Sequence, residues 1–329
     1  MVGDQAPKLQ TGQWVQGEPV PAFDTNHVYI VEFWATWCGP CVQSIPHLNQ
    51  VWQKFKDKGV VVIGQDIWDS DPAVAPFVKK MGTNMTYRVA LDDKALGDRG
   101  FMEQNWWPRG TNHHGIPTAF IINKDGMIAW IGHPMALKDG ILEEIVSGRH
   151  DLARATAQYK QEWEKNQKSA ALQTELFSAL NQKQWDEAEA ALNKIAATQP
   201  GNNGLAGIRL KILLGQKKFD EAYQLADSVS AANRNNADWQ NELAWTIAVS
   251  DGPNEQCLGL AEKIAGRGVE LTQRKDAAVL DTLARVQFML GKKEEAIATE
   301  QEAVNVASDP NAKAAAETTL ARYREGKLP

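Results

Sequence analysis

Two cysteines separated by two residues constrain this chain more than any other feature of its sequence. They lie in the segment Trp37-Cys38-Gly39-Pro40-Cys41. The apolar run at residues 29–34 predicts a buried strand before it, and the apolar periodicity after it predicts a helix that ends at Lys58-Gly59. This order delivers the cysteines to the N-terminus of a helix, where unpaired backbone N–H groups and the helix dipole favour negative charge.

The position of each thiol predicts its role. Thiolate is the reactive form of cysteine, so a helix start that stabilises negative charge makes Cys38 a nucleophile near neutral pH. Cys41 lies one turn into the helix, within reach of a mixed disulfide formed on Cys38. A structural disulfide or half of a zinc site is the alternative, but Cys257 is the only other cysteine, so a four-thiolate zinc site cannot be built. We therefore predict a redox-active Cys38–Cys41 pair that needs no metal and no other cofactor.

With these residues the chain resembles the thioredoxin superfamily, and within it the TlpA/ResA-like thiol–disulfide oxidoreductases. The resemblance rests on residues 32–41, on Pro46 within the following helix, on Gly115-Ile116-Pro117-Thr118 and on the turn at Lys124-Asp125-Gly126. The opening residues 2–7 are similar to the entry of TlpA-like and peroxiredoxin-like domains. The resemblance covers about the first 150 residues and implies a thioredoxin fold there.

The resemblance also implies a substrate-binding surface. Ile116-Pro117 corresponds to the cis-proline loop, which places Pro117 against the cysteines and lets the Ile116 backbone pair with a substrate segment as an added strand. Trp37, Gly39 and Pro40 are expected to contact the substrate beside the nucleophile. The residue pattern alone leaves open that Pro117 is an ordinary proline at the start of a strand.

Glu32 is an acidic residue on a strand that should be buried, where a carboxylate is costly unless it has a role. Its position matches the buried carboxylate of thioredoxins, which accepts or relays the proton of the second cysteine. ResA-like proteins carry a glutamate just after the motif instead, and the matching position here is Ser44. The resemblance therefore implies a thioredoxin-like proton relay through Glu32; a solvated carboxylate at a sheet edge is the alternative.

Strands and helices alternate through this first part. The continuous apolar run at 60–64 is typical of a central parallel strand covered on both faces. Residues 9–24, broken by glycine and proline, indicate a short hairpin or an irregular cover. Strands are further expected at 28–34, 86–91, 118–122 and 127–131, and helices near 71–81, 94–104 and 138–147. The pattern predicts an α/β thioredoxin fold, a mixed sheet with helices on both faces.

The segment before the cis-proline loop departs from the family pattern. Trp106 and Trp107 predict either an exposed grip for an unfolded thiol protein or simple loop packing. His113 and His114 leave copper or zinc binding open, because imidazole and thiolate are good ligands for these metals. Arg109 and His113 are also placed to add positive potential near the thiolate. The sequence does not decide between these roles.

From Asp151 onward the composition shifts to Ala, Gln, Glu, Lys and Asn, without a strand pattern. A short motif recurs there: Trp185-Asp186-Glu187-Ala188, Phe219-Asp220-Glu221-Ala222 and Lys293-Glu294-Glu295-Ala296, with lysine replacing the aromatic residue in the last copy. Ala188 and Ala222 lie 34 residues apart. This spacing resembles tetratricopeptide repeats, and it implies three to four helical hairpins in a right-handed solenoid with a capping helix at 311–324.

We therefore predict a thioredoxin-like redox domain at 1–150, a connecting helix at 151–168 and an all-α, TPR-like helical-repeat domain at 169–329. Such arrays bind peptides or proteins in their concave face, which predicts a protein partner; a structural or dimerising appendage is the alternative. Cys257 is most simply a small buried hydrophobic residue.

Charge and hydropathy limit the partners and the location. The net charge of −6 argues against nucleic acid or an anionic membrane surface as the main partner. No apolar run approaches the length needed to span a bilayer. The chain opens without a signal peptide, yet the resemblance implies an extracytoplasmic location, periplasmic or secreted; a cytoplasmic one stays open.

The leading hypothesis is a protein-disulfide reductase with a role in redox homeostasis, acting on disulfide-bearing or dithiol proteins and regenerated by an external thiol reductant. The Gly-Pro pair between the cysteines favours reduction over oxidation. A thiol peroxidase is one alternative, although Ala35-Thr36-Trp37-Cys38 replaces the usual Pro-x-x-x-Thr-x-x-Cys. A non-enzymatic adaptor or a copper- or zinc-binding module is the other.

Overall fold

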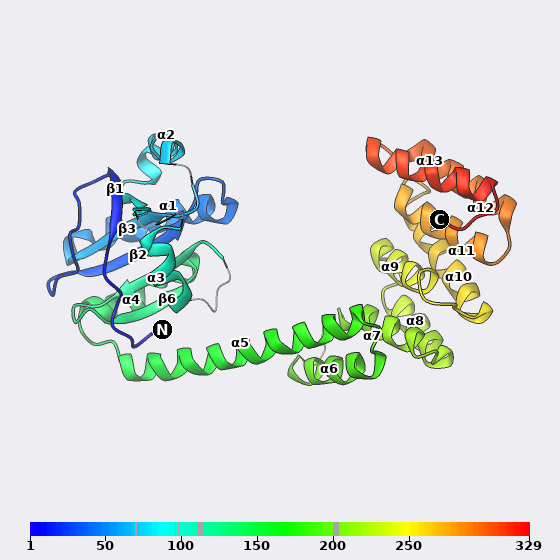
Figure 1. The fold of residues 1–329 in the computed structure, drawn as a ribbon, viewed down its shortest axis with the longest axis horizontal. Helices are drawn as coiled ribbons and strands as arrows, with labels where there is room; N and C mark the ends of the chain where they lie inside the picture. The colour runs from blue at the N-terminus through cyan, green and yellow to red at the C-terminus, as the bar shows by residue number, and fades with distance from the viewer. Residues whose placement is uncertain (70, 96, 98, 111–114, 200–203) are drawn as a thin grey trace. The chain divides into compact units, whose positions relative to one another are not determined.

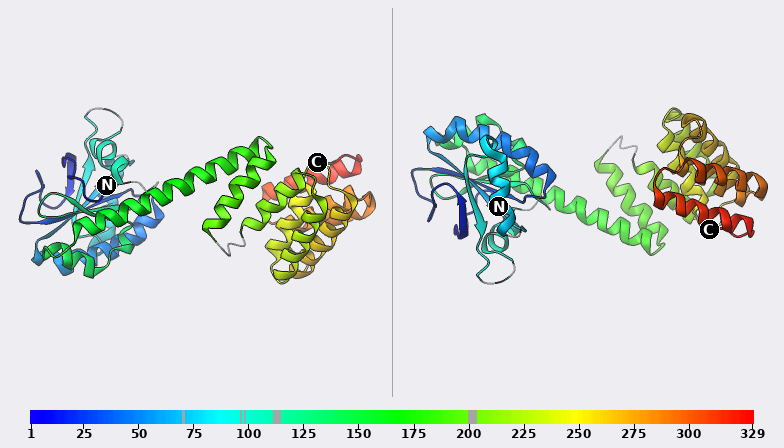
Figure 2. Two further views of the ribbon diagram at one scale, coloured as in Figure 1. Left: turned by 90° about the horizontal axis from the view of Figure 1, so that it is seen from below. Right: turned by 90° about the horizontal axis from the view of Figure 1, so that it is seen from above.

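The fold is given by a computed structural model (Figure 1), with two further views in Figure 2. It describes residues 1–69, 71–95, 97, 99–110, 115–199 and 204–329, and gives only the backbone of residues 71 and 107–110. The chain divides into two compact units, Met1–Lys168 and Ser169–Pro329. Helix α5 (Leu152–Asn181) runs through this division, so the connecting helix extends well beyond residue 168.

Unit 1 contains one six-stranded sheet in the order β1-β4-β3-β2-β5-β6. Strands β2, β3 and β4 are parallel, whereas β1 is antiparallel to β4, β5 to β2 and β6 to β5. The strands are β1 (Thr11–Gln16), β2 (Val28–Trp34), β3 (Val60–Asp66), β4 (Arg88–Asp92), β5 (Thr118–Ile122) and β6 (Ile128–Gly132).

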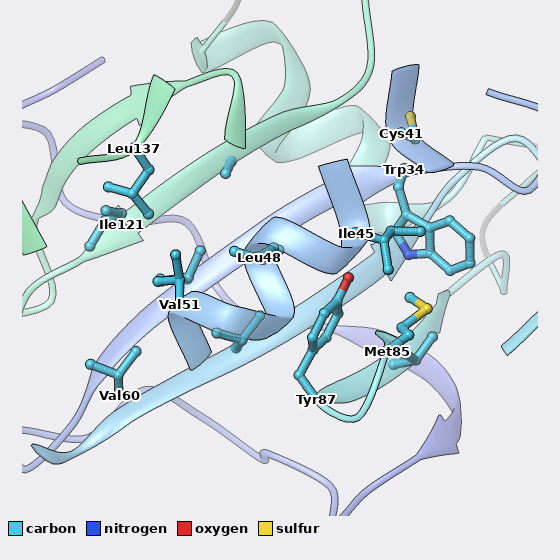
Figure 3. Close-up of a cluster of buried hydrophobic side chains, with 14 of the residues drawn as sticks. Trp34, Cys41, Ile45, Leu48, Val51, Val60, Met85, Tyr87, Ile121 and Leu137 are labelled. Carbon is cyan, nitrogen blue, oxygen red and sulfur yellow. The ribbon is translucent and has the colours of Figure 1, made fainter. Parts of the chain in front are cut away.

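Every residue of β2 and β3 is buried, which explains their continuous apolar character, since helices cover both faces of the sheet. Successive β2 side chains alternate between two clusters of apolar side chains. Ile30 belongs to the cluster under α1 (Gly39–Phe55), α2 (Asp71–Met81) and α4 (Asp139–Val146), shown in Figure 3.

The opposite face is covered by α3 (Phe101–Gly110) and by the first turns of α5, where Tyr29 and Phe33 of β2 pack with Trp106. Short 3₁₀ turns lie at Lys56–Lys58, Gly82–Asn84 and Pro134–Ala136. A mixed sheet with helices on both faces is the thioredoxin fold that the sequence predicted, and this prediction is confirmed.

Two expectations for unit 1 were wrong in detail. Of the two alternatives for residues 9–24, a hairpin or an irregular cover, the hairpin is wrong; the segment contributes the single edge strand β1, which pairs with β4. The helix expected near 94–104 begins only at Phe101, and the first N–H groups of its first turn are capped by a residue of β4. The buried carboxylate of Asp92 accepts hydrogen bonds of 2.8 Å from the backbone N–H groups of Met102 and Glu103.

The part of unit 2 that the structure describes is helical, as predicted. Its helices after α5 are α6 (Trp185–Thr198), α7 (Leu205–Gly215), α8 (Phe219–Ala232), α9 (Ala237–Ala248), α10 (Glu255–Leu271), α11 (Ala277–Met289), α12 (Lys293–Val306) and α13 (Pro310–Arg324). The recurring motif has a constant place: α6, α8 and α12 each begin at its first residue and each have 14 residues. Its alanines Ala188, Ala222 and Ala296 are all buried, where helices approach closely.

The turns before these three helices also repeat. Lys183, Lys217 and Gly291 occupy equivalent positions, and each has a left-handed backbone, with φ of 55°, 58° and 80°. The repeat visible in the sequence is thus a repeat of backbone conformation. Across the residues for which the structure gives coordinates, we find no helix with the length and apolar character of a membrane span.

Candidate active site

The cysteines lie where β2 ends and α1 begins. Cys38 is the N-cap residue of α1, and its Sγ accepts a hydrogen bond of 3.2 Å from the Cys41 backbone N–H. The structure holds the oxidised pair, a Cys38–Cys41 disulfide. Cys38 retains a 5% exposed fraction and Cys41 is fully buried. Only Cys38 therefore touches solvent, at a helix N-terminus that stabilises a thiolate once the pair is reduced.

The Ile116–Pro117 loop lies against this pair. Its peptide bond is cis, and the Ile116 carbonyl oxygen lies 3.6 Å from the Cys38 Sγ. Pro117 is buried, whereas Trp37, Gly39 and Pro40 are exposed around the Cys38 sulfur. Five residues that sequence analysis assigned to substrate binding thus gather around one sulfur atom.

Glu32 lies on the same side of the sheet as α1 and is fully buried. Tyr87 donates a hydrogen bond of 3.2 Å to its Oε2, and the Ser44 hydroxyl lies 3.3 Å from its Oε1. Burial raises the Glu32 pKa to about 8, although both hydrogen bonds act in the opposite direction. Burial also raises the pKa of Tyr87, and the charge of Glu32 adds to this.

One hydroxyl joins Glu32 to the second cysteine. The Ser44 Oγ donates to the Cys41 carbonyl oxygen over 2.9 Å while it lies next to the carboxyl of Glu32. The Ser44 hydroxyl is thus within donating distance of both the Glu32 carboxyl and the Cys41 backbone carbonyl, and its one proton serves one of them at a time. Ser44, which matches the position of the glutamate in ResA-like proteins, is thus the residue that contacts both Glu32 and the Cys41 backbone.

Sequence reasoning missed Trp68, which lies two residues after the end of β3. Its indole stacks on that of Trp37, with ring centroids 6.3 Å apart and planes inclined by 16°. No local signal predicts this contact, because Trp68 has a left-handed backbone that bulky residues rarely adopt.

Of the two roles left open for Trp106, an exposed grip and packing, the structure shows packing. Its side chain is fully buried in the core, and its Nε1–H donates to the Lys8 carbonyl oxygen over 3.1 Å. The Trp107 and Arg109 side chains, and His113 and His114 entirely, lie outside the described residues.

Among the described residues, no group of three or more His, Cys, Asp or Glu side chains is arranged to hold a metal ion. The structure therefore adds no support for the metal-binding alternative. Cys257 is buried in the core of unit 2, and burial raises the pKa of its thiol. It therefore has the character of a small hydrophobic residue.

Comparison with known proteins places unit 1 in context. Residues 2–131, less than half of the chain, match the AhpC/TSA family. Protein FixW of Rhizobium leguminosarum is 29% identical over 154 residues, which cover 45% of this chain and 66% of that protein. Thiol-disulfide oxidoreductase ResA of Bacillus thuringiensis subsp. konkukian is 35% identical over 128 residues, 39% of this chain and 66% of the relative. Unit 1 thus has thiol–disulfide oxidoreductases among its relatives.

A solved structure of a thiol:disulfide interchange protein of the thioredoxin family from Chlorobium tepidum TLS is 25% identical. It covers 43% of this chain and 95% of its own, with a TM-score of 0.36. The chain spans 66%, a little less than two thirds, of the two curated relatives. These similarities fall in the first part of the chain.

Proposed function

We propose that unit 1 is a protein-disulfide reductase that uses the Cys38–Cys41 pair, and that unit 2 recruits its protein partner. One observation carries the first proposal: a solvent-touching Cys38 caps a helix, with Cys41 buried behind it. The ResA relative, which carries the name thiol-disulfide oxidoreductase, supports the same reaction class. A structural disulfide would not need the nucleophile to be placed at the one end of the helix that stabilises its charge.

The reaction transfers two electrons. The Cys38 thiolate attacks one sulfur of a substrate disulfide, forms a mixed disulfide and releases the other substrate sulfur as a thiolate. Cys41 then loses its proton and attacks the Cys38 sulfur, which closes the Cys38–Cys41 disulfide and releases the second substrate thiolate. Both substrate thiolates take up protons. An external dithiol returns two electrons to the enzyme and becomes a disulfide.

Glu32 is the group best placed to manage the proton of Cys41. With a pKa of about 8 it changes protonation state near neutral pH, and Ser44, which contacts both Glu32 and the Cys41 backbone, places the carboxyl close to Cys41. In its ionised form Glu32 is therefore proposed to take this proton in the second step and to release it once the disulfide has closed. The Ile116 backbone beside Cys38 is proposed to pair with the extended substrate segment.

The proposed task of unit 2 is to raise the local concentration of a protein substrate or reductant. Its stacked hairpins resemble repeats that bind peptides, and the regular placement of α6, α8 and α12 supports this assignment. An extracytoplasmic location remains a prediction of the family resemblance.

Two cysteine variants test the proposed reaction. Cys38→Ser is expected to abolish reduction of insulin disulfides, whereas Cys41→Ser should accumulate a mixed disulfide through Cys38, detectable by mass. Both are made together with Cys257→Ala, so that the third cysteine cannot react. In the reduced parent, iodoacetamide at neutral pH should label Cys38 first. Faster labelling of Cys41 would reverse the assigned roles.

A thiol peroxidase is a second candidate, because residues 2–131 match the AhpC/TSA family. A peroxidase would turn over hydrogen peroxide with Cys38 alone when an external thiol is supplied. Turnover of peroxide by Cys41→Ser, together with failure of the parent to reduce insulin, would favour this candidate. A non-enzymatic adaptor predicts instead that partner binding and phenotype survive loss of both cysteines.

A further inference from the structure

Two exposed tryptophans form a stacked pair beside the reactive sulfur. Trp37 has an exposed fraction of 62% and Trp68 of 40%, and their rings are nearly parallel. Trp37 directly precedes Cys38 in the chain. Large apolar side chains are normally buried, so two that remain exposed together mark a surface that contacts something else.

The backbone holds Trp68 in this place at a conformational cost. Its φ of 68° lies in the left-handed region, where a bulky side chain clashes with its own backbone. The other described non-glycine residues with positive φ are Lys183, Lys217, Gln273 and Arg274, all in turns between helices of unit 2. Trp68 is the exception that lies in unit 1, next to the cysteines, and such conformations concentrate at functional sites.

The neighbours of the two tryptophans fix their segments to each other. The Asp69 carboxylate accepts hydrogen bonds from the Thr36 backbone N–H over 2.6 Å and from the Thr36 hydroxyl over 2.8 Å. The Ile67 backbone N–H donates to the Trp34 carbonyl oxygen over 3.0 Å. Since these bonds join the residues on either side of the indoles, the stacked pair is preorganised rather than a chance contact of mobile side chains.

From this geometry we propose that Trp37 and Trp68 form an aromatic platform that binds an aromatic or large apolar side chain close to the cysteine of a protein substrate. Trp68 is then a specificity-determining residue. A disulfide must approach the Cys38 sulfur to react, so the residues that flank it pass over the adjoining indoles. Indole faces attract aromatic rings in offset or edge-on geometry. This inference rests on the proposed disulfide reductase function and names the substrates it prefers.

A series of peptide disulfides tests the platform with the full chain. Each substrate is a symmetric disulfide of two copies of a peptide with one cysteine. The peptides have equal length and equal charge, and each carries a single Phe at one of the three positions on either side of the cysteine; a peptide with Ser at all these positions is the reference. For the reduced wild type we expect at least one Phe position to react about two- to tenfold faster than the reference, the range expected for one aromatic contact.

Substitution of Trp68 should remove this preference. Trp68→Gly takes up the same backbone conformation without strain, so it removes the indole and leaves the loop path intact. The Phe-to-Ser rate ratio should fall towards one in Trp68→Gly, which keeps only the Trp37 indole, and fall less in Trp68→Phe, as expected for loss and retention of an aromatic contact. Trp245→Ala is the matched control, because Trp245 in unit 2 is 39% exposed, nearly the same as Trp68, and the ratio should not change there.

The outcomes separate the two proposals. Failure of the wild type to reduce any peptide overturns the proposed function. Reduction of all peptides at one rate, or an unchanged preference in Trp68→Gly, overturns the platform alone. A binding measurement tests the platform independently of the disulfide reaction. The Phe peptide with its cysteine S-methylated should shift the indole N–H resonances of Trp37 and Trp68 in the oxidised chain, and the S-methylated Ser peptide should not. Equal shifts, or none, count against it.

Discussion

Glu32 is a fully buried carboxyl group within the candidate active site. Burial raises its pKa from 4.5 to about 8 in the folded chain. Between these values the unfolded chain releases the proton and the folded chain keeps it. Stability from this group is therefore fully present below about pH 4.5 and declines as the pH rises towards about 8.

The comparison of Glu32→Gln with the parent isolates this effect. Glutamine has no titrating carboxyl, so we expect the urea-unfolding free energy of the oxidised parent to fall relative to that of Glu32→Gln as the pH rises from 5 to 8. The reason is that each unit of pKa shift corresponds to about 1.4 kcal/mol of linked stability. Glu300 in unit 2 also has a pKa raised to about 8, first by burial and then by the charge of Asp281, so only the difference between the two proteins is informative. A difference independent of pH would mean that Glu32 is already ionised when folded.

Single residues also show where sequence reasoning ends. Cys38, Cys41, Glu32 and Pro117 could be singled out because each belongs to a local motif or a buried strand. Trp68 could not, since its stack with Trp37 depends on a left-handed backbone that a tryptophan gives no reason to expect.

At the scale of elements, the central strands were placed correctly from the sequence, whereas the start of helix α3 was not. The apolar runs of β2 and β3 are local signals of burial and are found where expected. Helix α3 was misplaced because its capping residue, Asp92, lies ten positions before Met102, at the end of β4. No sequence window around residues 94–104 contains that information. The buried Trp106 likewise has a distant partner, because its indole N–H donates to the carbonyl of Lys8, 98 residues away.

The repeated turns of unit 2 give a prediction at this scale. Lys217 and Gly291 occupy equivalent left-handed positions before α8 and α12, and only glycine takes this conformation without a clash. Lys217→Gly should therefore stabilise the chain and Gly291→Ala should destabilise it, each by about 1 kcal/mol. Urea unfolding followed by helical circular dichroism measures both.

The surroundings of Gly291 allow its backbone preference to be tested without a steric clash. A Cβ added there meets no atom within 4 Å, so Gly291→Ala changes the backbone preference and creates no collision. Gly259, which lies within α10 with an equally open surrounding and a helical backbone, is the control, and Gly259→Ala should stabilise. If Lys217→Gly and Gly291→Ala shift stability in the same direction, the two turns are not equivalent. The motif would then repeat in sequence but not in backbone conformation.

For the whole molecule, the two units differ in what they contribute. The groups proposed to carry the chemistry lie in Met1–Lys168, and the repeated hairpins lie in Ser169–Pro329. Composition places the change at Asp151, but packing places it later. Leu152, Ala155 and Tyr159 of α5 pack on the core of unit 1, and a side chain on Gly3 would collide with Thr156. The first turns of α5 therefore pack as part of unit 1. The sequence pattern alone did not show this.

Two truncations test this division. A fragment that ends at Lys168 keeps the α5 side chains that cover the sheet, so it should fold and reduce a small generic disulfide at the rate of the full chain. A fragment that ends at His150 loses these apolar contacts, each worth about 1.5–3 kcal/mol when a large side chain is fully buried, and should melt at a clearly lower temperature. Measured against a protein partner, the Lys168 fragment should lose rate selectively, because recruitment by raised effective concentration is gone. If it loses rate equally on small and protein disulfides, the repeats support the redox domain and recruit nothing.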